Sequence, residues 1–180
     1  MRVITGSARG RKLKTLEGND VRPTTDKVKE AMFSVLQFDI EGRRVLDLFA
    51  GSGQLGIEAL SRAAASAVFV DCSKRSIAVV NDNLASTSLA ENARVVMSDS
   101  IGFLSACRDE FDIVFLDPPY STGLLQSALA KVGSVMSDFA VAVCEHPTDE
   151  KLPDSAPGLT LAKRYKYGKT TVSVYRKDGQ

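Results

Sequence analysis

The 180-residue chain has little of what marks a secreted, membrane-spanning or metal-binding protein. Its first residues, MRVITGSARGRKLK, carry charges where a signal peptide needs an apolar core, and no apolar run approaches membrane-spanning length. The cysteines Cys72, Cys107 and Cys144 are odd in number, far apart and without metal-ligand spacing. We therefore expect a cytoplasmic protein with reduced, buried thiols and no bound metal.

Repeats, low-complexity tracts and linkers are also missing, and this length suits one domain with a small appendage. A composition with 44% hydrophobic and 25% charged residues is typical of a globular protein. The sequence predicts a basic N-terminal arm or hairpin over residues 1–21, turning at Gly6 and Gly10, and one folded domain over residues 22–180.

The net charge of +1 hides an uneven distribution. Residues 1–30 hold eight Lys and Arg against four acids, and residues 163–180 hold six against one. Residues 31–162 hold nine against seventeen. Basic ends on an acidic body indicate that a polyanion binds the ends while something else occupies the middle, although solvated surface charges are the alternative.

Strand-like and helix-like segments alternate through the middle of the chain. Apolar strands are predicted at 44–49, 67–71, 93–97, 111–116 and 139–145, with helices near 54–64, 74–86, 101–107 and 123–136. This order favours an α/β fold with a parallel sheet covered on both faces. Segments 159–168 and 170–176 lack an intervening helix and predict an antiparallel pair turning at Gly168–Lys169, and Thr24 or Thr25 can cap an earlier helix.

The first predicted strand runs into DLFAGSGQLGIEAL, where Gly51, Gly53 and Gly56 match G-x-G-x-x-G in a strand–turn–helix context. Asp71 ends the second strand, where an acid would hold ribose hydroxyls. A nicotinamide dinucleotide would fit these features, but Asp47 would then face its pyrophosphate, and the chain has no room for a dehydrogenase's substrate domain. A cofactor with a positive centre, such as S-adenosylmethionine, fits better.

The third strand ends at Asp99, whose carboxylate can accept from an adenine amine or cap the helix starting near Ser100. The sequence leaves both open. Acids at the ends of three neighbouring strands predict one nucleoside-and-amino-acid pocket at the carboxyl edge of the sheet.

The fourth strand ends in FDIVFLDPPYS, a stiff corner formed by Asp117, Pro118, Pro119 and Tyr120. Its prolines supply no N–H, so backbone carbonyls and the Asp117 carboxylate can accept hydrogen bonds while the Tyr120 ring offers a stacking surface. This arrangement suits a planar exocyclic amine. Hydrogen bonds from both amine protons would rehybridise the nitrogen and direct its lone pair at a methyl group. We interpret the corner as a methyl-acceptor site.

In this order the motifs resemble those of amino-methyltransferases that use S-adenosylmethionine. RPTTDKVKEAMFSVL, VLDLFAGSGQLGIEALSR, FLDPPY, EHP and KYGKTTVSVYR together resemble the bacterial 16S ribosomal-RNA guanine-N2 methyltransferase family RsmD, from Met1 to about Arg176. The resemblance implies a Rossmann-like methyltransferase with a seven-stranded sheet, an antiparallel C-terminal hairpin and a small N-terminal extension. The implied reaction is methylation of one guanine N2 amine in small-subunit rRNA.

The resemblance also implies a role for each motif residue. The methionine side of the cofactor site would be formed by Asp47, Phe49, Gly51 and Gly53, with Asp71 at the ribose and Asp99 and Ser100 at the adenine. The flipped guanine would lie against Asp117, Pro118, Pro119 and Tyr120. One departure is Ala63, where family members usually have glycine, and we expect only a modest effect on helix termination.

An RNA substrate agrees with the charge distribution, because a base must leave its stack to reach a pocket at the sheet edge. Phosphate contacts are expected from Arg2, Arg9, Arg11, Lys12, Lys14 and Arg22. Without a target-recognition domain, specificity is expected from the shape of 16S rRNA in the small subunit or an assembly intermediate, bound by a monomer. Lys163, Arg164, Lys166 and Lys169 would extend this surface only if the C-terminal pair lies on the same side.

Three other functions stay open from the residues alone. The DPPY corner also suits an adenine-N6 methyltransferase acting on DNA or RNA. A non-catalytic cofactor-binding factor in ribosome assembly is the second alternative, and a dehydrogenase is the third. His146, the only histidine, is expected to be a turn residue held by Glu145 or Pro147.

Overall fold

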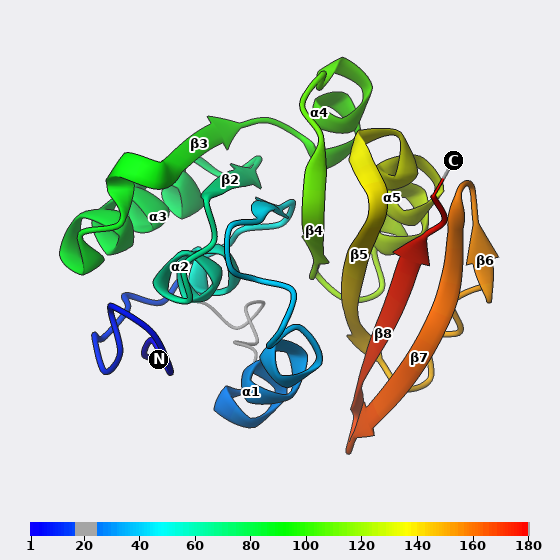
Figure 1. Ribbon diagram of the computed structural model, residues 1–180, viewed down its shortest axis with the longest axis horizontal. Coiled ribbons are helices and arrows are strands. Elements are labelled where there is room, and N and C mark those ends of the chain that lie inside the picture. The colour runs from blue at the N-terminus through cyan, green and yellow to red at the C-terminus, as the bar shows by residue number, and fades with distance from the viewer. Residues whose placement is uncertain (17–24, 180) are drawn as a thin grey trace.

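One twisted sheet organises the chain in the computed structural model, which describes residues 1–16 and 25–179 (Figure 1). The strand order is β3-β2-β1-β4-β5-β8-β7-β6. The strands are β1 (Arg44–Asp47), β2 (Ser66–Asp71), β3 (Ala93–Met97), β4 (Phe111–Leu116), β5 (Met136–Pro147), β6 (Ser155–Ala156), β7 (Leu159–Tyr167) and β8 (Thr170–Lys177). The first five in this spatial order are parallel, and the C-terminal three are antiparallel.

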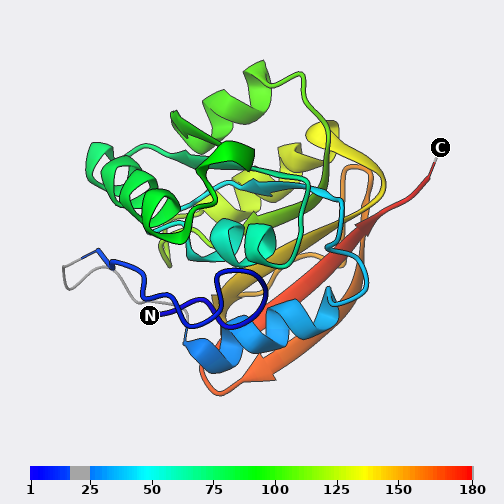
Figure 2. The same cartoon turned by 60° about the vertical axis from the view of Figure 1, so that its left-hand side comes forward.

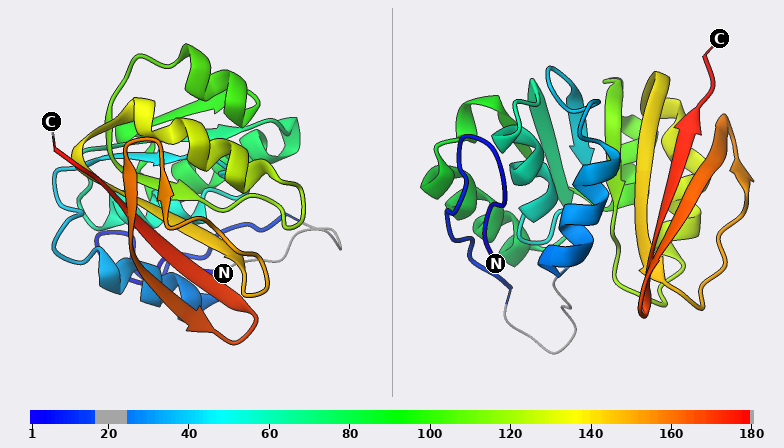
Figure 3. Two further views of the ribbon diagram at one scale, coloured as in Figure 1. Left: turned by 90° about the vertical axis from the view of Figure 1, so that its right-hand side faces the viewer. Right: turned by 60° about the horizontal axis from the view of Figure 1, so that its bottom comes forward.

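Helices cover both faces of the sheet (Figures 2 and 3). One face carries α1 (Asp26–Val35), α2 (Gln54–Ser61) and α3 (Lys74–Thr87), and the other carries α4 (Ser100–Ala106) and α5 (Leu124–Val132). Two short 3₁₀ turns, η1 (Ala90–Asn92) and η2 (Gly133–Val135), precede β3 and β5. The apolar residues form two cores, one on each face, which confirms the predicted doubly covered α/β fold.

The sheet has eight strands rather than the expected seven. The additional strand, β6, has only two residues, which pair with Leu159 and Thr160 at the outer side of β7. Two residues are too few to show the alternation that identifies a strand in sequence. The predicted antiparallel hairpin is confirmed, because Tyr167 pairs with Thr170 across the turn at Gly168–Lys169.

Strand order places the candidate residues at one edge. Successive strands lead outward from β1 through β2 to β3, whereas β4 and β5 lie on its other side. The order therefore reverses between β1 and β4, and ligands of open α/β sheets bind at the carboxyl ends beside such a reversal. The glycine loop follows β1 and the DPPY corner follows β4, so both segments lie at this carboxyl edge.

The N-terminal residues form a hairpin that packs on the domain. Arg2 bridges Lys12, and the Val3 N–H donates to the Arg11 carbonyl over 2.9 Å. Buried Val3, Ala8 and Leu13 join the core formed with α1 and α2. The predicted boundary between residues 21 and 22 lies outside the described residues.

The Glu58 carboxylate of α2 attaches this hairpin. Its two oxygens accept from the Ile4 N–H over 2.8 Å and the Thr5 N–H over 2.9 Å. The same fully buried carboxylate pairs with Lys29 of α1 at 3.4 Å and with Arg62 at 2.9 Å. Burial lowers the pKa of Lys29, which the Glu58 charge opposes. Buried charges need such partners, and here they join three segments distant in sequence.

The structure corrects one expectation about the thiols. Cys144 is buried, but Cys72 is exposed beside Asp71 and Cys107 is half-buried. Among the described helices, none combines the length and apolar character that crossing a membrane requires.

Substitution of Gly6 tests the close contact between the N-terminal hairpin and the end of α2. The φ of Gly6 is +87°, and an added Cβ would lie 1.7 Å from the Ser61 carbonyl oxygen at the end of α2. Gly10 has a similar φ of +82° with nothing within 4 Å of such a Cβ. We expect G10A to lose about 1 kcal/mol of unfolding free energy through backbone strain alone, and G6A to lose at least about 2 kcal/mol more through the clash. Urea denaturation measures both; equal losses would contradict the tight contact.

Ala63 is a position where a substitution is expected to stabilise the protein. It follows Arg62, the C-cap of α2, with φ of +69°, the left-handed conformation that favours glycine after a helix. We expect Ala63→Gly to raise the free energy of unfolding by about 1 kcal/mol, because glycine removes the steric cost of this conformation. Thermal denaturation checks this, and an unchanged or lowered melting temperature would contradict it.

Candidate functional site

The glycine loop between β1 and α2 depends on backbone conformations that glycine favours. Gly51 and Gly53 have φ of +55° and +79°. Gly56 has a different role, because a Cβ there would lie 2.3 Å from the Phe69 ring of β2. The first two glycines thus form the turn, and the third lets α2 approach the sheet closely.

Asp47 lies beneath this loop, only 2% exposed. Its carboxylate accepts from the Gly56 N–H over 3.0 Å. Burial raises the pKa of Asp47 to about 7, and the nearby Asp71 charge contributes in the same direction, whereas the Gly56 bond opposes the shift. The sequence predicts that this carboxylate faces the cofactor; the structure shows that it supports the start of α2 through the Gly56 N–H.

Asp71 joins the loop to the end of β2. One carboxylate oxygen accepts from the Gly51 N–H over 2.9 Å, and the other accepts from the Ser73 N–H over 2.8 Å. The residue is half-buried, and each carboxylate oxygen can accept more than one hydrogen bond. Asp71 therefore fixes the loop and keeps capacity for a ligand's hydroxyls.

Asp99 is the N-cap of α4, one of the two roles that the sequence left open. Its carboxylate accepts from the Gly102 N–H over 2.7 Å, and the residue is exposed at the end of β3. Ser100 is buried at the first helical position. Phe49, half-buried after β1, packs against the core on the α4 and α5 face. Asp71 and Met97 are register partners, so the two acids end neighbouring strands.

The corner after β4 is fixed by its surroundings. Pro118 is buried and Pro119 is exposed, and the Thr122 hydroxyl donates to the Pro119 carbonyl over 2.8 Å. The Tyr120 hydroxyl donates to Glu145 of β5 over 3.2 Å. Burial, reinforced by the Glu145 charge, raises the pKa of Tyr120 to about 12. Tyr120 thus stays protonated near neutral pH, with its ring tied to β5.

Glu145 is the residue of this corner that sequence reasoning missed. It was considered only as a partner for the neighbouring histidine, yet it is buried at the end of β5 and contacts Tyr120. The His146 ring bonds to the Pro147 carbonyl at 2.9 Å, one of the two expected partners, and to the Ser173 hydroxyl at 2.8 Å. His146 lies within β5 and not in a turn, because its backbone continues the ladder to β8. The sequence did contain a signal for Glu145: it is an acidic residue at the end of an apolar strand, in the strand that neighbours the one leading into the DPPY corner.

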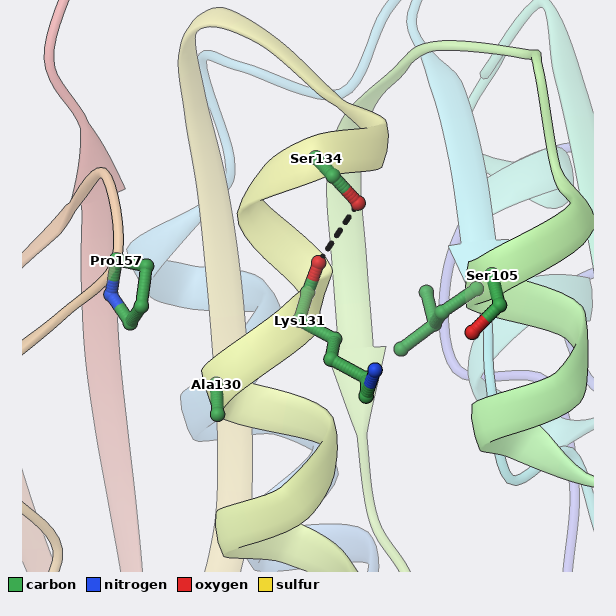
Figure 4. Close-up of a pocket in the computed structure, with 6 residues that line it drawn as sticks. Ser105, Ala130, Lys131, Ser134 and Pro157 are labelled. Atoms are coloured by element: carbon green, nitrogen blue, oxygen red, sulfur yellow. Dashed lines mark hydrogen bonds between the residues drawn. The ribbon is translucent and has the colours of Figure 1, made fainter.

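A separate groove of about 290 Å³ lies between α4 and α5 (Figure 4). Its walls are Leu104, Ser105, Ala130, Lys131, Ser134 and Pro157. None of the residues predicted to bind cofactor, base or RNA lines it. The corner has its own small pocket, formed by residues 118–123 with Leu125, Glu145 and Glu150.

The predicted RNA-binding residues of the hairpin do not all lie near the glycine loop. Arg2, Arg9, Arg11, Lys12 and Lys14 are all exposed, and Arg22 lies outside the described residues. The backbone of Lys14 bonds to Asn83, whose amide also donates to the Ser52 carbonyl, so Lys14 lies beside the loop. Arg9 follows Ala8, whose N–H bonds to Ser61 at the opposite end of α2, an eight-residue helix about 12 Å long.

Comparison with known proteins decides the family. The profile of the family described as "Conserved hypothetical protein 95" matches residues 1–176. The chain belongs to this family. It is 37% identical over 182 residues to "Ribosomal RNA small subunit methyltransferase D" of Escherichia coli (strain K12), covering 100% of this chain and 91% of the relative. The resemblance to the RsmD family is thereby confirmed.

Further relatives agree. "Putative rRNA methyltransferase YlbH" of Bacillus subtilis (strain 168) is 40% identical over 184 residues, covering 99% of this chain and all of the relative. Among solved structures, "Putative methyltransferase yhhF from Escherichia coli" has a TM-score of 0.86 at 36% identity, covering 100% of this chain and 99% of that one. The fold is therefore that of S-adenosylmethionine-dependent methyltransferases.

The residues at the carboxyl edge fit S-adenosylmethionine chemically. Gln54 at the start of α2 has a buried side-chain oxygen without a hydrogen-bond partner among the described residues, so a donor is missing there. A Cβ on Gly51 would meet only Leu16, at 4.0 Å, which leaves room beside the loop. A cofactor with an ammonium group, a sulfonium and ribose hydroxyls offers a donor, a positive charge for Asp47 and partners for Asp71.

The raised pKa of Asp47 predicts how the free energy of unfolding depends on pH. Its pKa of about 7 in the folded protein exceeds its usual 3.8, so its charge destabilises the fold increasingly as pH rises from about 4 to 7. D47N keeps an oxygen for the Gly56 N–H. At pH 8, without cofactor, we expect D47N to raise the free energy of unfolding by up to about 4 kcal/mol, while weakening S-adenosylmethionine binding.

Urea denaturation at pH 5 and pH 8, with calorimetry of cofactor binding, checks both expectations. The gain in stability should be larger at pH 8. Exposed Asp138 gives the matched control D138N, which should change neither property. A D47N protein that is less stable than wild type at pH 8 would contradict the account of the buried charge.

Proposed function

We propose that this protein methylates the exocyclic N2 amine of one guanine in 16S ribosomal RNA, with S-adenosylmethionine as the methyl donor. Methylation of ribosomal RNA follows from membership of the RsmD family, with 37% identity to a small-subunit methyltransferase over the whole chain. The finer assignment to a guanine N2 amine rests on the motif resemblance. A monomer acting in the cytoplasm on the small subunit or its precursor completes the proposal.

The observation that carries the proposal is the convergence of the glycine loop and the DPPY corner. Both follow adjacent parallel strands, with Asp47 of β1 paired with Phe115 of β4 two residues before Asp117. Neighbouring strands are about 4.8 Å apart, so a methyl donor at the loop and an amine at the corner can approach closely. Holding two reactants at such a distance is itself a large part of catalysis.

Each residue has a proposed task in binding. Asp47 and the Gly51–Gly53 turn hold the methionine part of the cofactor, with Phe49 beside it. Asp71 accepts from the ribose hydroxyls, and Asp99 and Ser100 lie at the adenine. When bound, S-adenosylmethionine supplies an electrophilic methyl group.

The DPPY corner orients the accepting amine. Asp117 and the carbonyl groups of the corner accept from the two amine protons, which directs the nitrogen lone pair toward the cofactor side. The Tyr120 ring stacks on the flipped base, held in orientation by its bond to Glu145. Because Tyr120 has a pKa of about 12, its hydroxyl remains a donor and does not act as a base at neutral pH. The amine proton leaves to solvent or to an acceptor of the corner after methyl transfer.

The first experiment measures transfer of radiolabelled methyl groups to small subunits from a strain lacking this protein, followed by digestion and identification of the labelled nucleoside. Labelled N2-methylguanosine at one position is expected. Labelled N6-methyladenosine would keep the mechanism but overturn the substrate. Cofactor binding without any label would favour a binding factor and contradict the proposal.

Asp117 gives the sharpest variant. We expect D117A to reduce the rate of methyl transfer by roughly 100-fold or more, because an acceptor that orients the amine is lost, while cofactor binding stays near the wild-type value. Exposed Asp138 at the opposite edge gives the control D138A, which should retain full activity. A D117A protein with wild-type turnover would remove this residue from the proposed acceptor site.

A further inference from the structure

We propose that the tip of the β7–β8 hairpin, residues 166–169, contacts the RNA backbone on the side of the acceptor corner opposite the N-terminal hairpin. This inference rests on the proposed RNA substrate. It assigns a partner to basic residues whose location the sequence left open. The contact is with phosphates, so it supplies affinity and orientation rather than base recognition.

Strand register places this tip at the carboxyl edge. Leu116, the last residue of β4, pairs with Cys144 of β5, which pairs with Ser173 of β8. Three residues further along β5, Pro147 pairs with Thr170, which pairs with Tyr167. The hairpin therefore turns on the carboxyl side of the sheet, beyond the ends of β4 and β5 (Figure 1).

Two attachments keep the tip in this position. The Thr148 N–H donates to the Lys169 carbonyl over 3.0 Å, and the Thr148 hydroxyl donates to the Gly168 carbonyl over 3.2 Å. Thr170, which follows the tip, also lies close enough to the Tyr120 hydroxyl to oppose the rise of the Tyr120 pKa. The tip is thus fixed to the residue that follows β5, and its lysines extend from a hydrogen-bonded turn.

The tip lysines differ from other cations of the C-terminal region. Arg164 bonds to Asp154 and to the Leu152 carbonyl, and Lys177 bonds to the Met136 carbonyl. Lys166 and Lys169 are exposed, and neither side chain forms an ion pair within the described residues. These two lysines can therefore contact phosphates without breaking an internal bond.

Acidic groups between the two basic hairpins strengthen the argument. Asp117, Glu145 and Glu150 surround Tyr120, and they repel a phosphate while favouring an amine donor. On one side of them lies Lys14 beside the glycine loop, with its ammonium 2.7 Å from the Asp82 carboxylate, and on the other lie Lys166 and Lys169. β7 is three strands from β4, on the order of 14 Å. A strand of RNA crossing the edge would place phosphates at the flanks and its flipped base at the centre.

The test compares K166A/K169A with R108A/K131A, a control that removes the same charge. Arg108 follows α4 and Lys131 ends α5, and both precede strands at the opposite edge of the sheet. Small subunits from a strain lacking this protein serve as the probe. Binding is measured from 50 to 200 mM salt, and methyl transfer is measured at varied subunit concentration.

We expect K166A/K169A to raise KM for subunits roughly tenfold and to reduce the salt slope of binding by about 2, one for each lost phosphate contact. Its kcat and its affinity for S-adenosylmethionine should match wild type, as should every property of R108A/K131A. If wild type methylates subunits but the tip variant behaves like the control, the inference is overturned and the proposed function stands. If wild type does not methylate them, the proposed function itself fails.

Discussion

The hydrogen bonds and ion pairs of the buried Glu58 carboxylate hold together the elements on the face of the sheet that carries α1 and α2. This carboxylate is fully buried, and it accepts from two backbone N–H groups of the N-terminal hairpin while pairing with Lys29 of α1 and with Arg62, the C-cap of α2. Removing a partner from such a group leaves a buried charge uncompensated, which is strongly destabilising. The same helix begins at the glycine loop, so this cluster joins the proposed RNA-binding hairpin to the cofactor site through one rigid element.

At the other end of α2, carboxylates hold the loop itself. Asp47 bonds to Gly56 from below, and Asp71 bonds to Gly51 from the neighbouring strand. Burying Asp47 without a cation raises its pKa to about 7, a cost that the positive charge of a bound cofactor would offset. The buried charge of Asp47 thus lowers the stability of the free protein and would strengthen binding of a positively charged cofactor, as is common at functional sites.

The charge distribution along the chain acquires a spatial meaning in the fold. The acidic middle of the sequence supplies the carboxylates at the ends of β1, β2 and β3 and around the DPPY corner, where positive or amine groups are proposed to bind. The basic ends form two hairpins, and the Lys14 end of one and the turn of the other lie on either side of the acidic centre. This separation would guide a polyanion across the edge and let only a base enter the acidic centre.

The sequence by itself determined the fold class, the glycine loop, the proline corner after β4 and the family, because these depend on local patterns: apolar strands, glycines at fixed spacing and two consecutive prolines. It did not reveal the two-residue β6, the attachment of Tyr120 to Glu145, or the shared role of Glu58, since each depends on partners from 25 to 54 positions away in the chain or on a strand too short to carry a pattern. The helix-capping bond of Asp99 was foreseeable because its partner is three residues away. Only the tertiary structure decided which basic residues lie near the carboxyl edge, because strand register, and not position in sequence, sets where a hairpin turns.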